Sequence, residues 1–252
     1  LPRGEGKTTI VACAVLWAIL CGHRRYVVII GADQAAAEKL LDGIRAALDS
    51  GDALLAHYPE ACHYVRALEG LPQRAAGQLA SGERTGIRWR SDSIVLPQVP
   101  MSAEALEFCA GAVVEARGLT GRVRGLQQTL KDGTILRPDF VFLDDPQTRE
   151  SATSPAQCDE REDLIRSDVA GLAGIGGKQI AMVVACTVIA EGDLADRILQ
   201  TWHAVRTKAL IKFPDAADTL WREYVRIRRK RGRRGSRPGR ATISTGATAR
   251  RW

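Results

Sequence analysis

The sequence has few cysteines, few aromatic residues and no long apolar run. Its six cysteines are scattered without a C-x-x-C pair, a pattern that favours reduced thiols in a cytosol-like compartment over a disulfide framework. The longest apolar run, Ile10–Leu20, is shorter than the about 20 residues that a membrane-spanning helix needs. We therefore expect a buried helix there and no membrane partner. The first residues lack the order of a secretory signal, and no Ser-His-Asp or Cys-His arrangement indicates nucleophilic catalysis.

Acidic residues are missing from the end of the chain. No Asp or Glu follows Glu223, whereas eleven of the 36 Lys and Arg residues lie between 226 and 252. The other 25 stand against 29 acidic residues, so residues 1–225 carry a net charge of −4 and the chain as a whole +7. Such a basic run is expected to be disordered. It either binds nucleic acid through its phosphates or is a solvated, unstructured end.

The first fifty residues predict an α/β order of elements. Residues 8–21 are apolar at helical length and predict a helix packed by apolar neighbours all round. The β-branched run Arg25–Asp33 predicts a strand covered on both faces. An amphipathic segment follows up to Ser50, with Asp33 as its N-cap. Helix, strand and helix in this order are typical of a parallel sheet flanked by helices.

The rest of the chain continues this pattern less regularly. We expect short strands within 86–97 and 111–118, and a hairpin within 129–140 because Asp-Gly separates two apolar runs. Further strands are expected at 139–147, Gln179–Val188 and, more weakly, 203–213, and helices at Ser154–Leu172 and Gly192–Thr201.

The opening "LPRGEGKTT" matches the end of the phosphate-loop pattern G-x-x-x-x-G-K-[ST] at Gly6, Lys7 and Thr8, with Leu1 in the place of the first glycine. Small residues let backbone N–H groups converge on a phosphate, and the helix that follows points its positive end at it. In this pattern Lys7 reaches the β- and γ-phosphates, and the Thr8 hydroxyl binds Mg²⁺. The alternative is a glycine-rich turn that starts a helix.

Two further segments carry polar residues at the ends of predicted strands. "FVFLDD" ends in Asp144 and Asp145, of which the first suits a metal ligand and the second a base that activates water. "MVVACTV" carries Thr187, whose hydroxyl would lie beside the γ-phosphate. Solvated loop acids and an ordinary strand-end threonine are the alternatives, and the presence of a phosphate loop upstream favours the functional interpretation.

Together, "PRGEGKTT", "RPDFVFLDDPQTRESA" and "ACTVIAEGDLADRIL" resemble the large terminase subunit of tailed bacteriophages, the motor that packages DNA into capsids. "GLTGRVRG" and "LIKFPDAADTLWREY" are also similar to that family, so the resemblance covers roughly Leu1–Tyr224. It implies a P-loop NTPase of the additional-strand (RecA-like) type, in which the strand of the third motif lies between the phosphate-loop strand and the two-carboxylate strand.

The resemblance also implies roles for single residues. It implies that ATP binds to the loop and the start of its helix, at Gly4, Glu5, Gly6, Lys7, Thr8 and Thr9. It implies that Thr8 and Asp144 bind Mg²⁺. Asp145 becomes the catalytic base, where many relatives have Glu, and Thr187 belongs to the coupling motif. Arg3 becomes a cation that stabilises charge on the transferred phosphoryl group, with a loop cation held by Glu5 as its alternative.

The sequence departs from the family at both ends. The segment with the adenine-contacting residues and the first strand is not present before Leu1, and no acidic cluster of a nuclease follows Glu223. We therefore expect a fragment: residues 1–225 as an N-terminally truncated ATPase domain and 226–252 as a basic, disordered tail without the nuclease domain. A sheet without its central strand leaves backbone groups unpaired, so we expect this polypeptide itself to be a poor or inactive ATPase.

The resulting functional hypothesis is an ATP-hydrolysing motor subunit that moves double-stranded DNA into a capsid. The resemblance implies ATP and Mg²⁺ as cofactors, and double-stranded DNA, a portal protein and a small terminase subunit as partners. It further implies a homo-oligomeric ring and the host cytoplasm as location. Two alternatives stay open: a helicase or repair ATPase of related fold, and a non-catalytic nucleic-acid-binding protein that acts through the basic tail. Arg122 and Arg124 of "GRVRG" either contact a phosphate backbone or complete a neighbour's active site.

Overall fold

The computed structural model describes residues 6–99, 109–174, 180–208, 212 and 215–232. The chain divides into two units, Leu1–Thr207 and Lys208–Trp252. The predicted positions of Arg3, Gly4 and Glu5 lie outside the described residues.

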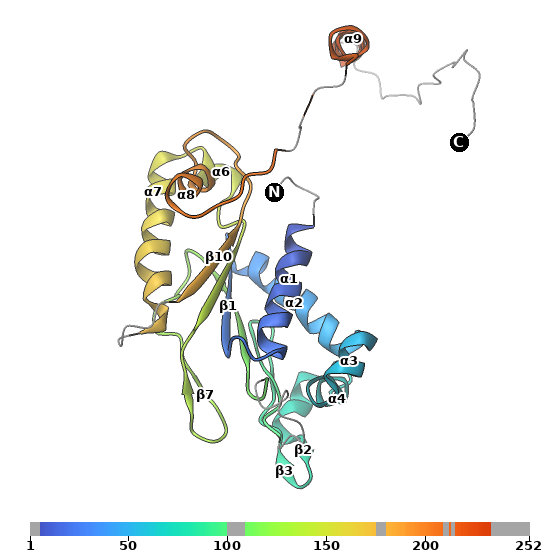
Figure 1. The fold of residues 1–252 in the computed structure, drawn as a ribbon, viewed down its shortest axis with the longest axis vertical. Coiled ribbons are helices and arrows are strands. Elements are labelled where there is room, and N and C mark those ends of the chain that lie inside the picture. The colour runs from blue at the N-terminus through green and yellow to red at the C-terminus, as the bar shows by residue number, and fades with distance from the viewer. Residues whose placement is uncertain (1–5, 100–108, 175–179, 209–211, 213–214, 233–252) are drawn as a thin grey trace, which may run out of the picture. The chain divides into compact units, whose positions relative to one another are not determined.

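The first unit is built on a six-stranded sheet with the order β10-β9-β1-β6-β5-β4 (Figure 1). Its four longest strands are parallel to one another: β1 (Tyr26–Gly31), β6 (Val113–Gly118), β9 (Phe140–Asp144) and β10 (Ala181–Ala185). Two short strands, β5 (Ser93–Val95) and β4 (Arg88–Trp89), continue the sheet with antiparallel pairing. The expected mostly parallel α/β sheet is therefore confirmed, and it is compatible with a P-loop NTPase.

Helices cover both faces of this sheet (Figure 1). One group comprises α1 (Lys7–Leu20), α2 (Gln34–Ser50), α3 (Asp52–His57) and α4 (Pro59–Arg66). The other comprises α6 (Arg149–Ala152), α7 (Pro155–Leu164) and α8 (Leu194–Thr201), and α7 continues through a π-helical turn η2 (Ile165–Val169) and a 3-10 turn η3 (Ala170–Ala173). Short elements between strands are η1 (Pro72–Gly77) and the hairpins β2 (Leu79–Ala80) with β3 (Glu83–Arg84) and β7 (Gln128–Thr129) with β8 (Ile135–Leu136).

The alternation of β1 residues between the two faces explains its continuous apolar run. Val27 and Ile29 belong to the core that α1, α2 and α4 cover. Tyr26, Val28 and Ile30 belong to the core on the other face, which is closed by η2, η3 and α8. Because both faces are buried, both sets of side chains are apolar. The expected cap of α2 is also confirmed, since the Asp33 side chain accepts a hydrogen bond from the Ala36 N–H at 2.8 Å.

Helix α1 differs from the expectation of apolar neighbours all round. Val11, Val15 and Ile19 are buried in the core, but Ile10 and Trp17 are each 59% exposed. The helix is thus apolar on a solvent-exposed face as well as on its core face. Among the described residues no helix is long and apolar enough to cross a bilayer.

The second unit contains a helical turn, η4 (Ala217–Trp221), followed by α9 (Arg222–Gly232). The expectation of an unstructured tail from residue 226 does not hold for 226–232, which are helical. Ion pairs of Arg222 with Asp218 and of Arg226 with Glu223 lie at its start, and such neighbours three or four residues apart support a helix. The strand expected over 203–213 is wrong for residues 203–208, which are irregular, and most of the remainder lies outside the described residues.

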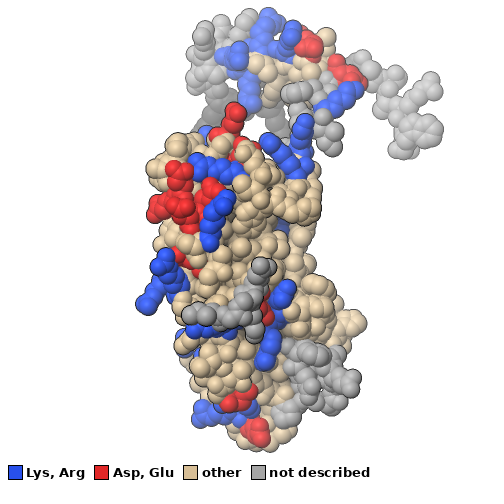
Figure 2. All heavy atoms as spheres, turned by 60° about the vertical axis from the view of Figure 1, so that its left-hand side comes forward, with Lys and Arg blue, Asp and Glu red and all other residues tan. Residues whose placement is uncertain are grey.

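The two units differ in how their charges are distributed (Figure 2). On the face of the first unit that includes α7 and α8, acidic and basic side chains are interspersed, and Arg197 pairs with Asp159 and Glu162. In the second unit, basic side chains gather on α9.

Candidate functional site at the carboxyl edge of the sheet

The parallel strands bring three distant segments to one edge of the sheet. The register aligns Asp144 at the end of β9 with Gly31 of β1 on one side and Ala185 of β10 on the other. Residues that directly follow these strands therefore lie together, and Thr187 comes two residues after β10. The amino-terminal end of α1 meets the same edge through its first two residues.

Gly6 allows α1 to start where it does. It is the N-cap residue with φ 73°, a left-handed conformation that glycine adopts without steric cost. Within the described ranges no side chain caps the helix, so none of these residues occupies its first backbone N–H groups. Free N–H groups and the helix dipole make such an end suitable for an anion.

Lys7 connects the three segments. It is buried, and its Nζ donates hydrogen bonds to Asp145 Oδ2 at 3.1 Å and to Oδ1 at 3.2 Å. The same ammonium group donates to the Thr187 hydroxyl. The Asp145 side chain is 47% exposed, so the pair is accessible from solvent. The structure thus brings together the lysine of the first motif, the second aspartate and the threonine of the third.

Thr8 and Asp144 form a second contact beside the first. The Thr8 hydroxyl donates to Asp144 Oδ2 at 3.2 Å. Burial, and next the neighbouring negative charge of Asp145, raise the pKa of Asp144 above its usual value. The other oxygen, Oδ1, is buried and has no hydrogen-bond partner among the described residues. A buried carboxylate with an unused oxygen is costly unless a cation or donor binds it.

This donor set fits Mg²⁺. The ion prefers hard oxygen ligands and is often held by one or two protein oxygens together with substrate phosphates and water. Thr8 Oγ1 and the unpartnered Asp144 Oδ1 are ligands of that kind. In the described part of the chain, no group of three or more His, Cys, Asp or Glu side chains forms a metal site of its own.

Asp145 has an uncommon backbone conformation. Its φ is 41°, in the left-handed region that aspartate enters more readily than most residues. Its N–H donates to the Ala185 carbonyl at 2.8 Å, which joins the end of β9 to β10. Non-glycine residues at positive φ are enriched at functional sites, because the surrounding structure has to hold them there.

Cys186 lies between β10 and Thr187. Burial, and next the charge of Asp145, raise the pKa of its thiol to about 11. A thiol with this pKa is protonated at pH 7, whereas a nucleophile has to be a thiolate. Cys186 therefore lacks the thiolate form that a cysteine nucleophile uses at this pH.

Gln147 and Asp193 are polar residues of this region that the sequence did not reveal. Gln147 is 6% exposed, and its Nε2 donates to the Thr187 carbonyl and to Asp193 Oδ2, both at 2.9 Å. Asp193 is fully buried and accepts hydrogen bonds from the N–H groups of Ile189 and Ala190. The pair holds the loop after β10 against the loop after β9, and so fixes the position of Thr187.

The only sequence signal for this pair was at Asp193. An aspartate before a helical pattern predicts an N-cap, and Asp193 does cap α8 by accepting from the Asp196 N–H at 2.8 Å. Gln147 gave no signal of its own. Of the remaining predicted site residues, Thr9 is an exposed residue of α1, and the contacts among the three segments involve Lys7 and Thr8 instead.

Comparison with known proteins adds no relative to this picture. No model of a protein family matches the sequence, and no curated protein matches it either. The interpretation of the site therefore depends on the geometry and on the motifs.

Proposed function

We propose that this chain carries the ATP-hydrolysing site of a phage terminase motor, which moves double-stranded DNA into a capsid. The observation that carries the proposal is the meeting of Lys7, Thr8, Asp144, Asp145 and Thr187 at one sheet edge, although the contacting residues are 136 to 180 positions apart in sequence. Each of these residue types has a role in phosphoryl transfer from ATP.

The residues of the chain divide the work of ATP hydrolysis as follows. The uncapped N–H groups at the start of α1 and the Lys7 ammonium bind the phosphates. Thr8 and Asp144 would hold Mg²⁺, which neutralises phosphate charge when it is bound. Asp145 accepts a hydrogen bond from the attacking water and orients it. The Thr187 hydroxyl lies within contact of Lys7 and therefore beside the phosphate that Lys7 binds.

The movement of DNA is a further step of the proposal. It is supported by the resemblance of the motifs to terminases and by the charge of the second unit, where basic side chains gather on α9. The portal protein, the small terminase subunit and the ring of subunits belong to this part of the proposal.

The binding of nucleotide tests the first part. We expect Mg·ATP to bind the chain, and Lys7→Ala and Asp144→Ala to reduce this affinity strongly. The matched controls Lys39→Ala and Asp49→Ala, at exposed positions of α2, should leave the affinity unchanged. The measurement is titration calorimetry with Mg·ATP. Equal affinity in all four variants would overturn the assignment of the site.

The properties of α9 favour one second candidate, a nucleic-acid-binding protein without catalysis. Arg226, Arg228 and Arg229 are exposed on this helix, and exposed arginines neutralise phosphates in a salt-dependent way. Salt-dependent binding of duplex DNA that is lost on deletion of 226–252, in a chain that does not bind Mg·ATP, would favour this candidate over the ATPase.

A further inference from the structure

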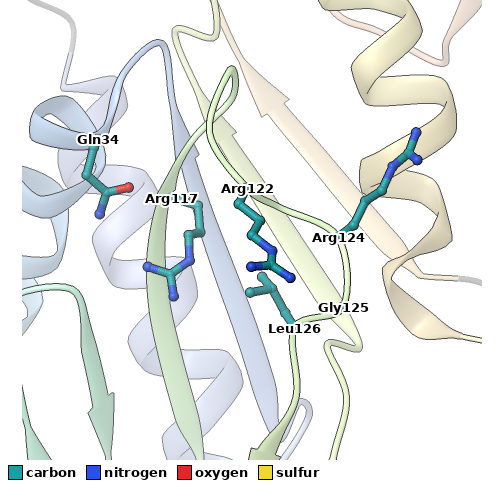
Figure 3. Close-up of a pocket in the computed structure, with 6 residues that line it drawn as sticks. All are labelled: Gln34, Arg117, Arg122, Arg124, Gly125 and Leu126. Carbon is teal, nitrogen blue, oxygen red and sulfur yellow. The ribbon is translucent and has the colours of Figure 1, made fainter.

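A second concave region lies at the carboxyl edge of the sheet, away from the Lys7 site. It is a pocket of about 380 Å³ at the end of β6 (Figure 3), lined by Gln34, Arg117, Arg122, Arg124, Gly125 and Leu126. In the order of the sheet, β1 lies between β9 and β6. Neighbouring strands are about 4.8 Å apart, so the end of β6 is about 10 Å from the end of β9. The pocket volume lies within the range of about 300–1,000 Å³ that is usual for ligand sites.

The loop after β6 presents the arginines because its apolar residues are anchored. Leu119 and Val123 are buried, and the Leu119 N–H donates to the Gly31 carbonyl at 2.9 Å. Arg122 and Arg124 flank the buried Val123 and are exposed. Figure 3 shows Arg117 and Arg122 extending in the same direction from strand and loop, whereas Arg124 extends towards the helical segment that follows α7.

Two of the three guanidinium groups are fixed by carboxylates. Arg117 pairs with Glu115 and, at 3.1 Å, with Asp92. Arg124 pairs with Asp168 of η2 at 2.6 Å. Arg117 is therefore held in place, but much of its charge is compensated.

Arg122 is different. Within the described part of the chain it has no ion-pair partner and no hydrogen-bond partner. Its guanidinium is thus the cation at this pocket whose charge is free to attract a ligand. A guanidinium presents paired N–H donors that match the oxygens of a phosphate group.

We infer that this pocket is a second anion site, which binds a phosphate group through Arg122, with Arg117 as a pre-oriented neighbour. The phosphate group belongs either to a free anion such as inorganic phosphate or pyrophosphate, or to the backbone of a nucleic acid. The inference does not depend on ATP hydrolysis, because it uses none of the residues of the Lys7 site.

The experiment is a titration of the full chain with pyrophosphate and, separately, with a short DNA duplex, each at two salt concentrations. Arg122→Gln removes the charge and leaves a shorter, polar side chain. Arg122→Lys keeps the charge and loses the paired donors. Arg74→Gln, at an exposed arginine of η1, is the matched control, and circular dichroism checks the fold of each variant.

We expect Arg122→Gln to weaken the binding of pyrophosphate roughly 10-fold, as the loss of one charged hydrogen-bonding group does, and Arg122→Lys to weaken it less. Arg74→Gln should leave this binding unchanged, whereas Lys7→Ala removes only the pyrophosphate that binds at the Lys7 site. If the backbone of a nucleic acid is the source, Arg122→Gln also lowers the slope of log affinity against log salt by about 1 for the duplex, and pyrophosphate competes with the duplex.

Each outcome decides between the sources or against the site. A loss confined to pyrophosphate assigns the pocket to free anions, and a loss for both ligands with competition assigns it to the nucleic acid backbone. Equal binding of both ligands by the wild type and Arg122→Gln would overturn the inference. The loss of ATP binding in Lys7→Ala is a separate readout, so failure of the proposed ATPase function is recognisable independently.

Discussion

One edge of the sheet carries two groups of charged residues that are built in opposite ways. Counting only the residues that the structure describes, one buried lysine faces two aspartates at the ends of β9 and β10, and Asp144 Oδ1 has no hydrogen-bond partner. At the end of β6, carboxylates hold Arg117 and Arg124, and Arg122 is the group for which these residues supply no partner. In our proposals the first group would therefore bind a cation together with an anion, whereas the second would bind an anion alone.

This difference shows that a charged side chain without a partner indicates the kind of ligand better than the net charge of its surroundings does. The formal charges of Arg117, Arg122 and Arg124 cancel those of Asp92, Glu115 and Asp168, yet one guanidinium has no partner in the described part of the chain. Both groups lie at strand ends, where the backbone hydrogen bonds between strands stop and polar side chains follow in the chain. The substitutions below test the two groups separately, from the largest expected effect to the smallest.

The largest effect is expected from Lys7→Ala. The loss of hydrogen bonds from a charged donor costs about 1.5–3 kcal/mol each, so the affinity for Mg·ATP should fall about 10- to 100-fold. Arg122→Gln should change that affinity less than about twofold, because β1 separates its strand from β9. Calorimetric titration of both variants checks the comparison. A similar loss in both would mean that the two groups form one site.

Gln147→Leu should destabilise the first group. The substitution removes the donor to buried Asp193 Oδ2 and to the Thr187 carbonyl, and an unsatisfied buried polar group costs about 1–3 kcal/mol. Urea denaturation measures this free energy of unfolding, and Gln73→Leu at an exposed position of η1 is the control. Hydrogen exchange at the amides of Ile189 and Ala190 should also become faster. Unchanged stability and exchange would show that Gln147 does not hold the loop.

Gly118→Ala tests the second group, because the end of β6 closely approaches α2. A Cβ at Gly118 would lie 2.6 Å from the Gln34 backbone nitrogen, and such overpacking costs about 1–3 kcal/mol. Gly43→Ala is the opposite control, since a Cβ at this exposed position of α2 would have no described atom within 4 Å. There alanine should stabilise the helix by about 0.5–1 kcal/mol. Thermal unfolding of both variants gives the sign of the change in stability relative to the wild type. A Gly118→Ala variant as stable as the wild type would contradict the close approach of Gly118 to the backbone of Gln34.

The smallest effect is expected from Asp144→Asn in the absence of ligand. The pKa of Asp144 is raised by burial and by Asp145, so the unfolded state loses this proton at lower pH than the folded state, and stability is lost as pH rises. The amide lacks this titration. The variant should therefore gain in melting temperature over the wild type as the pH is raised from about 4 to 7, while its binding of Mg·ATP is weakened. A constant difference across this range would argue against a raised pKa.

Much of the fold followed from local patterns in the sequence. The β-branched run around Val27 and Ile29, the cap at Asp33 and the Asp-Gly turn at 132–133 each gave a local signal that the structure confirms. The proximity of Asp144 and Thr187 also followed from strand ends, because the carboxyl ends of parallel strands share an edge.

Other features depended on contacts between distant residues. Gln147 has no periodic or motif signal, and its two acceptors lie 40 and 46 residues further along the chain. The order of the strands and the exposed face of α1 with Ile10 and Trp17 are set by which elements pack together. The start of α9 was missed because a basic composition outweighed the ion pairs that support the helix at Arg222 and Arg226.

The contacts of Lys7 with Asp145 and Thr187 affect how an anion could bind to its ammonium group. One ammonium group has three protons, and those directed at Asp145 and Thr187 are not directed at a phosphate. Any anion that attracts Lys7 has to compete with these two residues, and by thermodynamic reciprocity a tighter internal pair means a weaker hold on the anion by the same free energy. Under the proposed function, the Asp145 carboxylate would therefore lose its ion pair with Lys7 only when a bound anion accepts the hydrogen bonds of the ammonium group.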